Sequence, residues 1–290
     1  MGKLILQKIS DEGTNNKFIA RLSSGIMELR DWAIRSKFGC NEATEEFERV
    51  RLIFDQKYGV VYDAMNTTRI NTKKLVNIYD EHIRKINCDG IKSTHNTIEL
   101  PESIDREMKE GVATILLSGN RAIKMTQEIL KMFDIEIGFF YQNEQNFVKG
   151  LKKLKLKEDM DDLADYLVTI RTEWSCSFIN RRSSLEHQSW MLPDMIYKLN
   201  SKGKYMVVEP TIDNLLVTSY IVIMSNRIFL FVENILAYTF QKQLPAPIIL
   251  TEFNANHTDE RIPLKRFKIS MAGFGEAEFR IQNGYEDFYI

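Results

Sequence analysis

The residues best suited to chemistry lie in one short polar segment in the second half of the chain. Arg182 and His187 stand five positions apart there, with Ser183 between them and Arg181 directly before. Arginine stays charged and holds a phosphate with two parallel hydrogen bonds. Histidine titrates near neutrality and moves protons. Without a metal ion, the pair therefore suffices to activate an RNA 2′-hydroxyl and to stabilise the charge on the attacked phosphorus.

The spacing of this pair sets a geometric condition on the chemistry. On a straight helix five residues turn through about 500°, which leaves the two side chains roughly 140° apart. Ser183 and Glu186 match the capping-box pattern, which predicts a bend and a new helix start between Arg182 and His187. Free N–H groups at that helix N-terminus would form a seat for a phosphate. Two copies of the pair at a dimer axis would supply both an acid and a base.

The run from Arg182 to His187, with the sequence RSSLEH, resembles the Arg-polar-x-x-x-His motif of the HEPN superfamily. Arg181 gives the alternative six-residue spacing that this family also allows. The resemblance covers at most residues 101–245. It implies a helical bundle that dimerises, pairs two motifs in a cleft, and often acts as a metal-independent endoribonuclease in toxin–antitoxin or other defence systems.

The resemblance also implies roles for single residues. Arg182 would bind the phosphate and His187 would transfer the proton, with Arg181 and Ser183 as further phosphate-binding residues. Ser183 occupies a slot in which the family more often has Asn or Asp. RNA is the implied substrate, and a cognate antitoxin or another protein is a possible partner.

Two other interpretations of the segment remain open. In the first, the chain is a non-catalytic helical dimer that binds RNA, a nucleotide or a protein partner through a degenerate motif. In the second, Arg182 and His187 form a capped, solvated break between helices, as in an interaction or regulatory subunit without a phosphate site. The residue types alone do not separate these interpretations.

Charge, cysteine content and absent motifs limit the functions that the chain can have. The 290 residues carry a net charge of −1, so no overall field attracts nucleic acid, and RNA contact requires a local patch. Three widely spaced cysteines suit a reducing compartment, which makes the cytoplasm the expected location. No cofactor or metal is expected, because the GxxxxGK[ST], GxGxxG, HExxH and GxSxG motifs are absent from the sequence.

Apolar spacing of three and four residues predicts the elements that position the motif. The expected fold is mostly all-α, a multi-helix bundle with a small β-rich C-terminal appendage. Helices are predicted over 18–35, from about 42, after 71, over 101–133 and 139–154, after the acids at 158–162, and over 210–240. Strands are predicted over 204–208 and within 246–290, and residues 3–9 form a strand or an irregular arm.

Turn-prone sequence from 88 to 100 suggests a boundary between parts of the chain. Residues 1–100 then form an N-terminal helical region of unknown role. Residues 101–245 form the HEPN-like helical bundle, and residues 246–290 form a β-rich tail packed on it.

Residues 215–240 are the most apolar stretch and raise the question of a membrane span. Polar residues at 225–227 and 233–234 interrupt this stretch. The arginine among them costs about 2.5–3.5 kcal/mol at the centre of a bilayer. A buried bundle helix without membrane contact is therefore expected, and its surplus of apolar surface favours a homodimer.

Ser219, Asn226 and Glu233 recur every seven residues along this apolar helix. Such a polar seam is typical of a solvent-exposed face. Alternatively, Asn226, Arg227 and Glu233 line the same cleft as the arginine–histidine motif.

Overall fold

The structure, a computed structural model, describes residues 16–40, 44–89, 92–94, 97–99, 103–199, 205–253, 264–273 and 275–282, with Gly13 and Gly284. The expected strand or arm at residues 3–9 lies outside these ranges. The first residues of the helices expected from about residue 42 and from residue 101 lie outside them as well.

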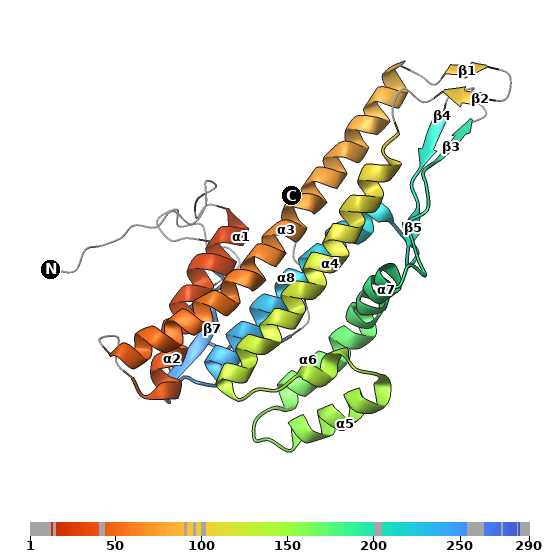
Figure 1. Cartoon of the computed structure of the whole chain (residues 1–290). Helices are drawn as coiled ribbons and strands as arrows, with labels where there is room; N and C mark the ends of the chain where they lie inside the picture. Colours follow the sequence, from red (N-terminus) through yellow and green to blue (C-terminus); the bar gives the residue numbers. More distant parts are fainter. Residues whose placement is uncertain are drawn as a thin grey trace. The chain divides into compact units, whose positions relative to one another are not determined.

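Helices make up most of the described chain, which confirms the predicted fold class (Figure 1). They are α1 (Lys17–Ile19), α2 (Ile26–Phe38), α3 (Glu45–Asp89), α4 (Asp105–Leu130), α5 (Glu144–Lys155), α6 (Asp161–Ile170), α7 (Cys176–Glu186) and α8 (Val217–Gln241). Short 3₁₀ turns, Lys131–Phe133 and Gly138–Tyr141, lie between α4 and α5. The π-helical turns Ala20–Gly25 and Arg171–Ser175 join α1 to α2 and α6 to α7, so each pair continues as one helical run.

The described strands form two-stranded antiparallel pairs. They are β1 (Lys92–Thr94) with β2 (Thr97–Glu99), β3 (Ile196–Leu199) with β4 (Tyr205–Val208), β5 (Thr211–Ile212) with β6 (Leu215–Leu216), and β7 (Ile248–Glu252) with β8 (Phe267–Met271). The strand expected over 204–208 and the β-rich tail are confirmed. The helix expected from residue 210 starts later, because the β5–β6 hairpin occupies residues 211–216.

The helices expected from about residue 42 and after residue 71 are a single helix, α3, drawn in orange in Figure 1. The polar residues between them look like a break in the sequence, but they are paired inside the protein. The hydroxyl oxygens of Thr68 and Ser118 of α4 lie 2.7 Å apart, as do those of Thr72 and Ser225 of α8. Because neighbouring helices satisfy these hydroxyl groups, α3 continues through them.

The chain forms two compact units, each built from separate stretches of sequence. The first holds residues 1–62, 123–169 and 230–288, and the second holds 63–122, 170–229 and the last two residues. The three-part division expected from the sequence stays a prediction.

In the first unit, aromatic side chains of α8 pack on other elements. The ring of Phe240 lies 5.9 Å from that of Phe54 in α3, and Phe231 stacks on Phe140 at 5.6 Å between ring centroids. All four side chains are fully buried. The second half of α8 therefore forms the centre of this unit's core.

In the second unit, Gly119 allows α4 to approach α7 and α8. A methyl group built on it would lie 2.5 Å from Ile228 Cδ1 and 2.9 Å from Phe178 Cζ. Both neighbours are 0% exposed, so neither side chain has free space to move into. This close contact fixes where α7, the helix that carries the motif, lies in the unit.

The apolar helix α8 has the length and composition of a membrane span, but 83% of its most apolar window is buried within the protein. Such burial is what a core helix of a bundle shows. The expectation that the chain makes no membrane contact stays a prediction.

Replacing Gly119 with Ala tests the close approach of α4 and α7. Overpacking should lower the free energy of unfolding by about 1–3 kcal/mol, although alanine favours a helix. Gly59→Ala is the matched control, because Gly59 is also inside a helix, is exposed and has no neighbouring atom within 4 Å of an added methyl group. In urea unfolding, the free energy of unfolding of this control should rise by up to about 1 kcal/mol, because alanine favours a helix more than glycine does. An equal gain for both variants would contradict the tight contact.

Candidate functional site

The arginine–histidine motif lies at the C-terminal end of α7. The helix runs unbroken from Cys176 to Glu186, and His187 is its C-cap residue. The His187 N–H donates to the Ser183 carbonyl at 3.0 Å, a regular helical bond across the motif. The bend and new helix start predicted from Ser183 and Glu186 are therefore wrong. A capping-box pattern is only local, and here the preceding helical residues continue through it.

The end of α7 differs chemically from the predicted phosphate seat. Gln188 adopts a left-handed conformation with φ of 54°, and the Ser189 N–H donates to the Ser184 carbonyl at 2.9 Å. This is the hydrogen-bond pattern of a Schellman helix end. A helix C-terminus presents carbonyl oxygens and the negative end of the helix dipole, so the backbone here offers no attraction to a phosphate.

Arg182 and His187 are separated by the straight helix. Arg182 is half-buried and forms an ion pair with Glu186, one turn further along. Its buried Nε atom has no hydrogen-bond partner among the described residues. His187 is exposed. Because the helix continues between them, the two side chains leave it roughly 140° apart, and one chain does not bring them together.

Arg181 is held by partners that the sequence did not reveal. Its Nη2 donates to Asp213 Oδ1 at 2.5 Å, and its guanidinium lies 4.8 Å from the centre of the Trp190 ring. Ser177, one turn earlier in α7, also donates to Asp213. Asp213 and Asn214 form the turn of the β5–β6 hairpin, with φ of 50° and 65°. Asp213 therefore fixes α7 to this hairpin.

The charge of Asp213 is stabilised at this position. Burial raises the pKa of its carboxyl, but the hydrogen bonds from Ser177 and Arg181 and the charge of Arg181 outweigh burial, and the pKa lies below its ordinary value. Tyr220 of α8 is electrostatically coupled to both Asp213 and Arg181. Its buried hydroxyl has no hydrogen-bond partner in the described structure, and burial raises its pKa. The Asp-Asn dipeptide is typical of tight hairpin turns, so it could have indicated from the sequence that Asp213 lies in a turn.

The residues predicted as cleft-lining lie in different environments. Asn226 and Glu233 are 0% exposed, so neither has surface to give to a cleft, and the solvent-face interpretation of both is wrong. Arg227 is half-buried, and Ser219 is exposed. The seven-residue spacing did not predict the burial of Asn226 and Glu233, because burial depends on partners from distant segments.

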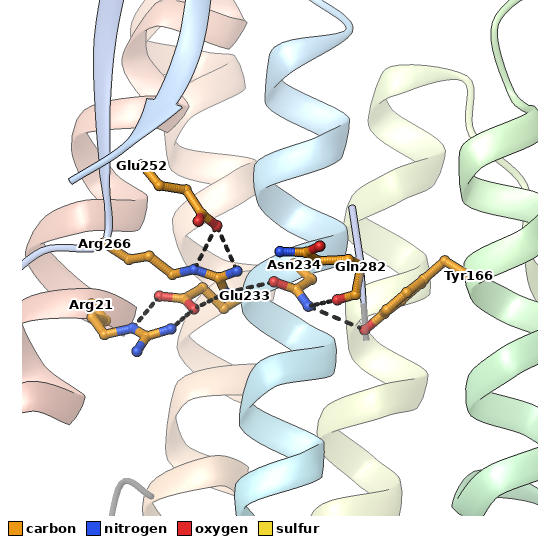
Figure 2. Close-up of polar contacts among 7 residues, drawn as sticks. All are labelled: Arg21, Tyr166, Glu233, Asn234, Glu252, Arg266 and Gln282. Carbon is orange, nitrogen blue, oxygen red and sulfur yellow. Dashed lines mark hydrogen bonds and ion pairs between the residues drawn. The ribbon is translucent and has the colours of Figure 1, made fainter. Parts of the chain in front are cut away.

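Glu233 is the centre of a buried charge cluster (Figure 2). Arg21, in the π-helical turn, donates from Nε to Glu233 Oε1 at 2.7 Å and pairs with the second oxygen through Nη2. Arg266, next to β8, donates to Glu233 Oε2 at 2.9 Å. Burial raises the pKa of Glu233, but the two guanidinium groups outweigh it and hold that pKa below its ordinary value.

The same cluster ties the C-terminal segment to α8. Arg266 also donates to Asn234 Oδ1 at 2.6 Å and to Glu252 Oε1 of β7 at 2.7 Å. Asn234 in turn donates to the Gln282 carbonyl at 3.0 Å. Two positive and two negative charges balance within the cluster, as Figure 2 shows. Its groups bind one another, which indicates a structural role.

In the part of the chain that the structure describes, no group of three His, Cys, Asp or Glu residues lies close enough to hold a metal ion. Comparison with protein-family models, with curated proteins and with solved structures finds no match to this chain.

The role of Asp213 predicts a pH dependence. Because its pKa is depressed in the folded state, its charge stabilises the fold above the unfolded pKa of about 3.9, and this stabilisation disappears as pH falls through the lower folded value. Asp213→Asn should lower the free energy of unfolding by about 1–2 kcal/mol at pH 7, and the difference from the unchanged protein should shrink below pH 4. Asn214→Gly keeps the carboxylate and a positive φ, and should retain the pH dependence. A constant difference down to pH 3 would contradict the role of Asp213.

The buried cluster predicts non-additive effects on stability. Glu233→Gln leaves two guanidinium groups without their shared carboxylate. It should lower the free energy of unfolding, measured in urea, by about 3–5 kcal/mol. The double change Arg21→Met with Glu233→Leu removes a buried pair and leaves Arg266 with Glu252, so it should cost far less than the single change. A double variant at least as unstable as Glu233→Gln would show that the ion pair does not determine the effect.

Proposed function

We propose that this chain is a metal-independent endoribonuclease of HEPN type whose active site forms where two copies meet. The observation that carries the proposal is the placement of Arg182 and His187. Both lie at the same end of α7, with His187 exposed, while the straight helix directs the two side chains apart. We propose that the two-fold axis lies at this end of α7, so that Arg182 of each copy meets His187 of the other.

The reaction needs only what these two side chains supply. Neutral His187 takes the proton from a 2′-hydroxyl, and the resulting oxygen attacks the adjacent phosphorus to give a 2′,3′-cyclic phosphate. Arg182 neutralises the charge on the phosphoryl oxygens. The 5′-oxygen leaves with a proton from a water molecule, so one Arg182–His187 pair suffices for the reaction.

Arg182 must exchange Glu186 for the phosphate in this proposal. An ion pair between residues four apart on a helix is worth only about 0.3–0.5 kcal/mol, so a phosphate displaces it readily. Arg181 is less available, because Asp213 and Trp190 already hold its guanidinium. We therefore assign the phosphate contact to Arg182, with Ser183 beside it, and a positioning role to Arg181.

A non-catalytic binding protein is the second candidate. It is favoured by the helix C-terminus at the motif and by the carboxylates that neutralise both arginines. In that case the segment binds RNA, a nucleotide or a protein without cleaving anything. A defence role and a cognate antitoxin follow only from the HEPN resemblance and belong to the nuclease proposal. A cytoplasmic location rests on the three widely spaced cysteines and fits both candidates.

Mixing two inactive variants tests the composite site. Arg182→Ala and His187→Ala should each reduce RNA cleavage in EDTA by at least about 100-fold. After the two proteins are unfolded and refolded together, half of the dimers are mixed, and each mixed dimer has one intact Arg182–His187 pair. Cleavage should then recover to about a quarter of the normal rate.

Other results of the mixing experiment separate the candidates. Inactive single variants with no recovery on mixing would place both residues in one chain and contradict the composite site. Absence of cyclic phosphate products from the unchanged protein would contradict the nuclease and favour the binding protein. Glu186→Gln is the matched control: it frees Arg182 without removing it and should leave cleavage intact or increase it.

A further inference from the structure

A small apolar pocket lies beside the motif in the second unit. It has a volume of about 220 Å³, and its walls come from α4, from the end of α7 and from the segment that follows α7. Val112 and Ala113 of α4 line one side, and Leu185, Trp190, Met191 and Leu192 line the other. Leu185 stands three residues after Arg182, so the pocket begins next to the proposed phosphate-binding residue on the same face of α7.

The indole ring in this pocket is fixed before any ligand arrives. The Arg181 guanidinium lies 4.8 Å from the centre of the Trp190 ring, and Asp213 holds Arg181 in turn. Trp190 remains half-buried, and Met191 is 71% exposed at the mouth of the pocket. A flat aromatic surface that is already held in place binds another ring with little further loss of conformational freedom.

The segment that forms the outer wall is tethered to α4. The Met195 N–H donates to Asp105 Oδ1 at 2.7 Å, and Lys109 donates to Asp194 at 2.5 Å. Lys109 also lies at the edge of the pocket. The volume is below the range of about 300–1,000 Å³ typical of sites for whole drug-sized ligands. The pocket therefore suits one flat ring system rather than a complete nucleotide.

We infer that this pocket takes one unstacked base of single-stranded RNA, next to the phosphodiester held by Arg182. The inference rests on the proposed function and specifies its substrate as an unpaired strand. Stacking on an aromatic side chain accepts any base, because every base has a flat face. The two charged residues of the lining already have partners, Lys109 in Asp194 and Glu110 in Arg106, and the rest of the lining is apolar. The pocket accordingly predicts selection for single strands and not for a sequence.

Binding of two uncleavable strands to the full-length protein tests the inference. One probe is a short 2′-O-methyl oligoadenylate, and the other is an abasic strand with the same number of phosphates. The unchanged protein should bind the adenylate more tightly than the abasic strand. Trp190→Ala should weaken adenylate binding roughly 5- to 150-fold and leave abasic binding unchanged.

Three further variants separate stacking from misfolding. Trp190→Phe keeps an aromatic ring and should retain most of the adenylate preference. Met191→Ala changes an exposed side chain and should weaken adenylate binding by a smaller factor. Trp32→Ala is the matched control, because Trp32 is also partly exposed and also lies under an arginine, Arg35, but lines no pocket described here. It should bind both strands normally.

Cleavage of unmodified RNA by the same variants distinguishes the two proposals. If the unchanged protein cleaves RNA and Trp190→Ala binds adenylate normally, the base pocket is wrong and the nuclease proposal stands. If nothing is cleaved but adenylate binding depends on Trp190, the pocket stands and the nuclease proposal fails. The base pocket would be overturned if the unchanged protein bound both strands with equal affinity or bound neither strand. Either result is expected if the pocket instead takes a side chain of a protein partner.

Discussion

The burial of α8 depends on partners for the polar side chains that interrupt its apolar sequence, above all for the carboxylate of Glu233. An unpaired charge at this depth would cost several kcal/mol or more, so the helix could not stay in the core without Arg21 and Arg266. These arginines come from opposite ends of the sequence and meet on α8 (Figure 2). One electrostatic requirement thus holds the N-terminal helices and the β7–β8 hairpin against the same helix, and it explains how so apolar a helix carries a buried carboxylate.

A second constraint governs the motif. Because α7 continues to Glu186, its geometry keeps Arg182 and His187 apart, and its C-terminal carbonyls favour a cation over a phosphate. Within one chain the segment is therefore incomplete for phosphodiester chemistry. The Asp213 contacts hold α7, Arg181 and Trp190 in place, which suits the surface that we propose meets a second copy. The proposed catalysis across a dimer axis would use both this fixed geometry and the separation of the two side chains.

The sequence predicted the helical class, the helix through residues 163–178, the core position of the stretch after 215, and the β-rich tail, because each depends on apolar periodicity within a short window. The sequence-based prediction failed where contacts with residues far away in the sequence determine the structure. Thr68 and Thr72 look like a helix break until Ser118 and Ser225 pair with them. Ser183 and Glu186 look like a capping box, but the helix before them overrides the local pattern. Glu233 looks like a solvent-facing residue because the local sequence shows no partner for its charge. Its arginine partners are more than 30 positions away in either direction. Asp213 could have been predicted from its turn dipeptide, but its contact with Arg181 could not.

The proposed composite site requires that two copies bring the ends of α7 together. The most direct measurement is the distance between spin labels on Ser189→Cys in two copies of a chain whose native cysteines are serine, recorded by pulsed dipolar spectroscopy. Ser189 is exposed and lies two residues after His187. A composite site requires a dimer with one short, narrow distance between the labels. A monomer at the working concentration, or a dimer with the labels on remote surfaces, would contradict it.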